Sequence, residues 1–98
     1  MMFFGEERLG PAALDARGDR LMSSARRRQG WSFAISRDFR GAAYSYVLAE
    51  NWRKAAQAFS ELAAYDLQFG GEHELSAASA LLRSAKCYGQ IEDKGTQQ

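Results

Sequence analysis

The 98-residue sequence has only one cysteine, one histidine and one proline. With a single cysteine, Cys87, the chain can form no internal disulfide and cannot build a cysteine-based zinc cage. His73 has no second histidine or cysteine at ligand spacing, so we expect no metal site and assign it a structural or solvated role. We expect Cys87 to be a small core residue.

Long apolar runs, a large net charge and catalytic motifs are also lacking. No uncharged stretch approaches the length of a membrane span, and the residues from Met1 to Glu7 do not form a secretory signal. The formal net charge of +1 argues against strong nonspecific attraction to nucleic acid. No glycine-rich phosphate loop and no nucleophile–base pair is found. We therefore expect a cytoplasmic protein that is not an enzyme, with no catalytic residue, no cofactor and no bound nucleic acid.

Abundant alanine and the near absence of strand-like alternation predict an all-α fold of about four helices. The expected helices cover residues 11–28, 36–50, 51 to the glycine pair at 70 and 71, and 72–90. Pro11 suits a first helical turn, Gly30 suits a C-terminal cap, and Ser36 and Asn51 suit N-caps. The predicted organisation is an N-terminal helix with an aromatic linker over 1–35, a helical hairpin repeat over 36–92, and a frayed polar tail over 93–98.

Each predicted helix carries apolar residues at helical spacing. These stripes are Leu14, Gly18, Leu21 and Ala25; Phe39, Ala42, Ala43, Tyr46 and Val47; Trp52, Ala55, Ala56, Phe59, Leu62, Ala63 and Leu67; and Leu75, Ala78, Leu82 and Ala85.

The sequence also repeats itself with a spacing of 42 positions, because Ala43 and Tyr46 recur as Ala85 and Tyr88. This pattern predicts tetratricopeptide-like antiparallel hairpins of a right-handed α-solenoid, although any alanine-rich bundle would share part of it. The expected packing residues of the repeat are Phe39, Ala43, Tyr46, Trp52, Ala55, Phe59, Ala85 and Tyr88. The last helix has no partner helix, so we expect it to expose an apolar face that includes Leu81, Leu82 and Tyr88.

The segment from Phe39 to Tyr88 resembles the SNAP family, the soluble NSF attachment proteins. The residues that carry the resemblance are Ala42-Ala43, Ala49-Glu50-Asn51-Trp52, Ala55-Ala56, Ala58-Phe59, Leu67-Gln68, His73, Ala77-Ala78 and Ala85-Lys86-Cys87-Tyr88. The resemblance implies an adaptor without enzymatic activity in vesicle-mediated transport, such as transport between the ER and the Golgi. Such an adaptor binds assembled, syntaxin-type SNARE bundles at the membrane and recruits the ATPase NSF.

The resemblance also implies a peripheral membrane contact, because the family carries an exposed hydrophobic loop after its first helix. The matching aromatic linker makes Trp31 and Phe33 the membrane-contact candidates, unless these rings pack between helices. Phe3 and Phe4 are further candidates, unless they fold back on the first helix or stay disordered.

A basic cluster accompanies this linker. Its members, Arg26, Arg27, Arg28, Arg37 and Arg40, are candidates for contact with lipid or with an acidic SNARE surface. The alternative is a solvated helix end that complements the helix dipole.

Three departures from the family pattern limit what the resemblance implies. The stretch before Asn51-Trp52 is several residues shorter than is typical, the double phenylalanine of the family loop is not present, and the C-terminal bundle that contacts NSF has no counterpart. We therefore expect a truncated or partial form that does not support SNARE disassembly, so that an NSF-type ATPase is a partner only of a longer form. The alternatives are a tetratricopeptide-like module that binds a peptide segment, and a small RNA-binding or regulatory protein that uses Arg26 to Arg28.

Overall fold

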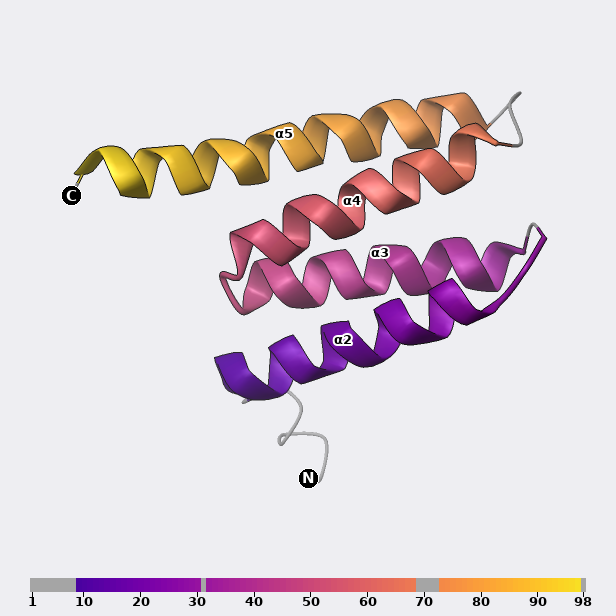
Figure 1. Ribbon diagram of the computed structural model, residues 1–98, viewed down its shortest axis with the longest axis horizontal. Coiled ribbons are helices and arrows are strands. Elements are labelled where there is room, and N and C mark those ends of the chain that lie inside the picture. Colours follow the sequence, from indigo (N-terminus) through magenta and orange to yellow (C-terminus); the bar gives the residue numbers. More distant parts are fainter. Residues whose placement is uncertain (1–8, 31, 69–72, 98) are drawn as a thin grey trace.

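The computed structural model describes residues 9–30, 32–68 and 73–97, and its regular structure there is entirely helical (Figure 1). The helices are α2 (Pro11–Arg27), α3 (Phe33–Leu48), α4 (Trp52–Leu67) and α5 (His73–Gln97). Neighbouring helices run antiparallel and lie side by side in chain order, so that they form a single layer (Figure 1). The predicted all-α hairpin fold is confirmed, whereas the right-handed twist of a solenoid stays a prediction.

The start of α3 differs from the sequence prediction. Ser32, in extended backbone, is the N-cap of α3, and its Oγ accepts a hydrogen bond from the Ala34 N–H at 3.1 Å. Because this cap lies one turn earlier than expected, the residues from Phe33 to Ile35 are helical. The assignment of Ser36 as the cap is therefore wrong, and Ser36 lies buried inside the helix.

The turn between α3 and α4 follows the prediction. Asn51 is the N-cap of α4, and its side chain accepts a hydrogen bond from the Lys54 N–H at 3.3 Å. Glu50 has a φ of 58° and supplies the left-handed residue of this tight turn. Helix α4 ends at Leu67, and the glycine pair expected to end it lies outside the described residues.

Helix α5 continues well beyond its predicted end at Gln90. It runs to Gln97, so the predicted helix end at about Gln90 is wrong, whereas the fraying of residues 93–98 stays a prediction. The sequence after Gln90 contains no proline, and most of its residues are ordinary helix formers, so nothing stops the helix.

The core consists mainly of alanines and a few aromatic rings. The buried alanines Ala42, Ala43, Ala55, Ala56, Ala63, Ala77 and Ala80 allow close approach of neighbouring helices. Phe39, Tyr46 and Phe59 are buried with them, and Trp52 packs against the cluster while partly exposed. Leu67, by contrast, is exposed, although its spacing placed it in the α4 stripe.

A buried carboxylate joins three helices. Asp66 of α4 is only 2% exposed and accepts hydrogen bonds from Ser36 Oγ at 3.4 Å and from Ser76 Oγ at 2.7 Å. Arg40 donates to the same Ser76 hydroxyl at 3.3 Å. This network satisfies the buried oxygens of Asp66 and ties α3, α4 and α5 together.

Helix α5 has one covered and one open side. Ala77, Ala80, Ser84 and Cys87 are buried at a spacing that places them on one side of the helix, toward α4. Leu75, Leu81, Leu82 and Tyr88 are exposed. The expectation that the last helix exposes an apolar face is therefore confirmed. Ala85 and Tyr88, which the repeat predicted as packing residues, are both exposed, so this part of the packing prediction is wrong.

Candidate functional site

The α2–α3 connection, where the membrane contact was predicted, is held by a tyrosine from α4. Tyr65 Oη accepts a hydrogen bond from the Ser32 N–H at 2.7 Å and donates to the Gly30 carbonyl oxygen at 2.9 Å. Gly30 has a φ of 73°, a conformation that glycine adopts without strain. The Tyr65 hydroxyl thus ties Gly30 and Ser32, the described residues of this connection, to α4.

The start of α3, the end of α4 and the start of α5 lie at the end of the helix layer that carries this turn (Figure 1), and each has one large exposed apolar side chain. Phe33, the first residue of α3, is 65% exposed, and Leu67 and Leu75 are exposed at the end of α4 and the start of α5. We call Phe33, Leu67 and Leu75 the loop end. Phe33 was a membrane-contact candidate from the sequence, whereas Leu67 and Leu75 were expected only in helix stripes. Their shared location follows from the antiparallel topology, which brings the start of α3, the end of α4 and the start of α5 to the same side.

The five candidate arginines do not form one free basic patch. Arg26 forms an ion pair with Glu61, and its Nε–H donates a hydrogen bond to Glu61 Oε1 at 3.0 Å. Arg28 pairs with Asp38 at 3.6 Å, and Arg40 is bonded to Ser76, as described above.

The remaining two arginines, Arg27 and Arg37, are exposed and form no ion pair within the described part of the chain. They lie in the last turn of α2 and the second turn of α3, on either side of the turn. These two guanidinium groups are therefore the ones available to an anionic partner near Phe33.

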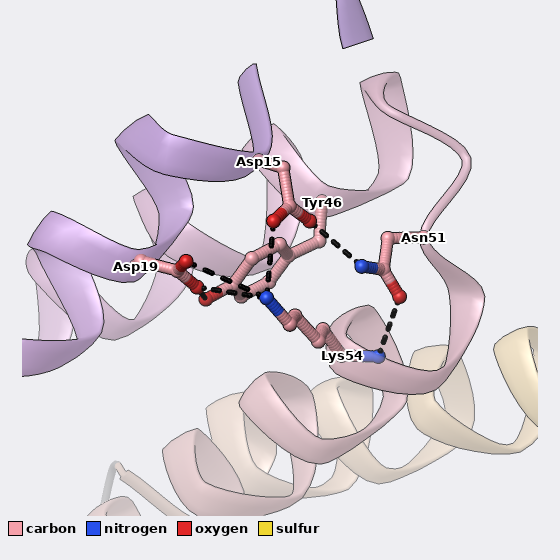
Figure 2. Close-up of polar contacts among 5 residues, drawn as sticks. All are labelled: Asp15, Asp19, Tyr46, Asn51 and Lys54. Atoms are coloured by element: carbon pink, nitrogen blue, oxygen red, sulfur yellow. Dashed lines mark hydrogen bonds and ion pairs between the residues drawn. The ribbon is translucent and has the colours of Figure 1, made fainter. Parts of the chain in front are cut away.

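A polar network near the other end of the layer orients α2 (Figure 2). Lys54 Nζ of α4 lies 3.0 Å from Asp15 Oδ2 and 3.2 Å from Asp19 Oδ1, both on α2. Tyr46 of α3 donates to Asp19 Oδ1 at 2.5 Å, and Asn51 donates to Asp15 Oδ1 at 2.7 Å. The network links α2 to both following helices and so fixes the helix that leads into the turn.

The charges of this network shift each other's protonation equilibria. The hydrogen bond from Tyr46, helped by Lys54, lowers the pKa of Asp19. The bonds to Asp15 and Asp19 raise the pKa of Lys54. Burial, followed by the bond to Asp19, raises the pKa of the Tyr46 phenol. Near neutral pH these shifts favour a charged Asp19, a charged Lys54 and a neutral Tyr46 phenol.

The comparisons with known proteins bear on residues 20–97, which match the family model described as soluble NSF attachment protein, SNAP. The chain belongs to the soluble NSF attachment protein family. Comparisons with curated proteins and with solved structures gave no match. The matched residues of this SNAP chain include the turn, Phe33 and the five candidate arginines, so the family likeness extends beyond the segment from Phe39 to Tyr88.

Several candidate residues of the SNAP chain have no structural description. Trp31, Phe3 and Phe4 lie outside the described residues, and Phe3 and Phe4 also precede the family match. Within the described ranges, no cluster of side chains suited to a metal ion is found. None of the described helices combines the length and apolar character that crossing a bilayer requires.

Proposed function

We propose that this SNAP chain is a non-enzymatic adaptor that attaches peripherally to membranes through the loop end and binds assembled SNARE bundles. The observation that carries the proposal is the exposure of Phe33, which follows the turn and lies between Arg27 and Arg37 in the sequence of a chain of the SNAP family. Recruitment of an NSF-type ATPase is the step that such adaptors serve.

The chemistry of the loop end supports membrane contact. An exposed phenyl ring gains free energy when it enters the boundary between headgroups and acyl chains. Each arginine near an anionic membrane surface adds about 1 kcal/mol of attraction. Because the Tyr65 hydroxyl bonds both Gly30 and Ser32, Phe33 can contact a membrane without the entropy cost of first ordering a long loop.

Liposome flotation tests the membrane part of the proposal. We expect the 98-residue chain to float with phosphatidylserine-containing liposomes, and the double variant W31S/F33S to lose most of this binding. The control is L82S/Y88S, which removes two exposed apolar side chains from α5 and should float like the wild type. Absence of wild-type flotation, or equal losses in the two variants, would contradict the proposed anchor.

A pull-down on a preassembled SNARE bundle in detergent tests the partner. Reversing the two available charges in R27E/R37E should weaken binding, with a stronger effect at low salt. R20E/R53E changes the net charge equally at exposed positions away from the turn and should bind like the wild type. If the wild-type chain fails to bind the bundle, or if both charge variants lose binding alike, the SNARE assignment of these arginines is wrong.

A further inference from the structure

The helix layer has two different faces. On α4, Lys54, Gln57 and Glu61 share one side of the helix, and Trp52 and Phe59, seven positions apart, share the opposite side. Hollows open on both sides. The residues that line each hollow show on which face the cations are left without a carboxylate partner.

The larger hollow, of about 340 Å³, lies on the first side and contains two cations, Arg26 and Lys54. Glu61 compensates Arg26, and Asp15 and Asp19 compensate Lys54. An incoming anion would have to displace these carboxylates. This hollow therefore offers little attraction for a charged ligand.

The second side carries an apolar hollow of about 190 Å³ between α3, α4 and α5. Its lining includes the side chains of Val47, Trp52, Phe59 and Cys87. Burial raises the pKa of the Cys87 thiol, which keeps this part of the surface uncharged. The volume is below the range of about 300–1,000 Å³ that is typical of small-molecule sites, and it suits a single bulky apolar side chain.

The wall of this hollow is fixed by ring contacts. The Tyr44 ring meets the Phe59 ring edge-on, with centroids 5.6 Å apart. The Arg83 guanidinium lies over the other part of this wall, 5.8 Å from the centroid of Tyr44. The same three residues also line an adjoining hollow of about 110 Å³ that reaches Arg40, so the two hollows form one continuous surface, which we call the α3/α5 groove.

The charge of the α3/α5 groove has one sign. Arg83, Lys86 and Arg40 line it, and among the residues that the structure describes neither hollow is lined by an aspartate or a glutamate. In the part of the chain that the structure describes, Arg83 and Lys86 form no ion pair. Uncompensated cations beside an apolar hollow are complementary to carboxylates next to an apolar side chain.

We propose that the α3/α5 groove binds an acidic peptide segment of a partner protein, which inserts one bulky apolar side chain into the hollow beside Trp52. Arg83 and Lys86 pair with carboxylates on either side of that anchor. The inference is independent of the adaptor function, because the groove lies along the helices and does not involve Phe33, Arg27 or Arg37.

Fluorescence anisotropy with a labelled peptide, Glu-Glu-Asp-Phe-Asp-Glu-Glu, tests the proposal. We expect saturable binding to the 98-residue chain. Replacing the peptide phenylalanine by alanine, or its acids by glutamine and asparagine, should each weaken binding on the order of tenfold. On the protein, R83E/K86E should weaken binding on the order of tenfold. R20E/R53E, with the same change in net charge, should leave it unchanged.

A second readout locates the bound peptide. The sequence has two tryptophans, so in a W31F background the emission reports on Trp52, which should shift when the anchor enters the hollow. Absence of saturable binding, equal affinity for the neutral peptide, equal losses in both charge variants, or binding without a change in Trp52 emission would each overturn the proposal. A circular dichroism melt of R83E/K86E verifies that its loss of binding is not a loss of fold.

Discussion

At the scale of single residues, Gly18 sets the distance between α2 and α3. A Cβ atom at this position would lie 2.5 Å from Cε1 of the Tyr46 ring. The ring cannot move aside freely, because it is buried and its hydroxyl is bonded to Asp19. Packing against Tyr46 therefore requires glycine at position 18. The helical spacing of apolar residues does not show this requirement.

We expect G18A to destabilise the protein despite the better helix propensity of alanine. The propensity gain is about 1 kcal/mol, whereas overpacking typically costs about 1–3 kcal/mol, so urea unfolding should show a net loss of up to about 2 kcal/mol. G89A is the matched control, because nothing lies within 4 Å of a Cβ built at Gly89 on α5. A variant G18A as stable as G89A would show that Tyr46 does not restrict this contact.

The Asp19–Lys54 pair should make stability depend on pH at both ends of the scale. A carboxylate with a lowered folded pKa stabilises the protein above its unfolded pKa of about 3.9, and this contribution disappears as the pH falls through the folded pKa. A lysine with a raised folded pKa stabilises below its unfolded pKa of about 10.4, and this contribution disappears as the pH rises further. The pKa of Asp19 is lowered by its contacts with Tyr46 and Lys54, and the pKa of Lys54 is raised by its contacts with Asp15 and Asp19.

Urea unfolding of D19N at pH 7 and pH 3 measures the acid side of this dependence. The variant should be less stable than the wild type at pH 7, and the difference should shrink at pH 3, because Asp19 of the unfolded wild-type chain is then mostly protonated and the advantage of the folded carboxylate decreases. D93N, which alters an exposed carboxylate on α5, should show no such convergence. A D19N deficit of the same size at both pH values would indicate a packing role for Asp19 instead.

The sequence reveals local features at this scale more readily than distant pairs. Asn51 could be predicted as a cap because a cap depends on residues only a few positions away. The contact between Asp15 and Lys54 joins residues 39 positions apart, and no spacing rule links them. Asp15, Asp19 and Lys54 were therefore missed, although all three are charged and lie within predicted helices.

At the scale of helices and turns, the helix patterns could be predicted, while some boundaries could not. Ser32 and Ser36 both qualify as N-caps by residue type, and only the backbone geometry selects Ser32. Leu67 continues the apolar spacing of α4, but it lies in the last turn, where its side chain stays exposed. Periodicity predicts which side of a helix is apolar, but it does not show where the neighbouring helix stops covering that side.

The turn before α3 should depend on one hydroxyl group. Y65F removes the hydrogen bonds to the Ser32 N–H and to the Gly30 carbonyl oxygen. It keeps the ring, whose centroid lies 5.7 Å from that of Phe39. We expect a loss of about 1–2 kcal/mol in unfolding free energy and faster hydrogen exchange at the Ser32 amide. Y88F, at an exposed position on α5, should change stability by less than about 0.5 kcal/mol. Unchanged exchange at Ser32 in Y65F would show that the turn holds its shape without this clamp.

At the scale of the whole molecule, α5 packs against α4, and among the described helices it has a neighbour on that side only (Figure 1). Its inner residues are as small and as buried as those of the preceding helices, whereas Leu75, Leu82 and Tyr88 remain exposed. The 42-position repeat predicted this asymmetry, because the counterparts of the exposed Ala85 and Tyr88 are the buried Ala43 and Tyr46. Because these outer leucines are largely exposed, they should be replaceable at little cost to folding.

The double variant L75Q/L82Q tests this asymmetry. Its unfolding free energy should stay within about 1 kcal/mol of the wild type, since each exposed position contributes about 0.5 kcal/mol or less, while binding of the dye ANS should fall with the loss of apolar surface. L62Q, at a core position that is 2% exposed, should lose at least about 2–5 kcal/mol, because it creates a cavity and buries an amide. If L75Q/L82Q were instead destabilised as strongly as L62Q, the outer side of α5 would be covered in solution, and concentration-dependent sedimentation would then show whether a second copy covers it.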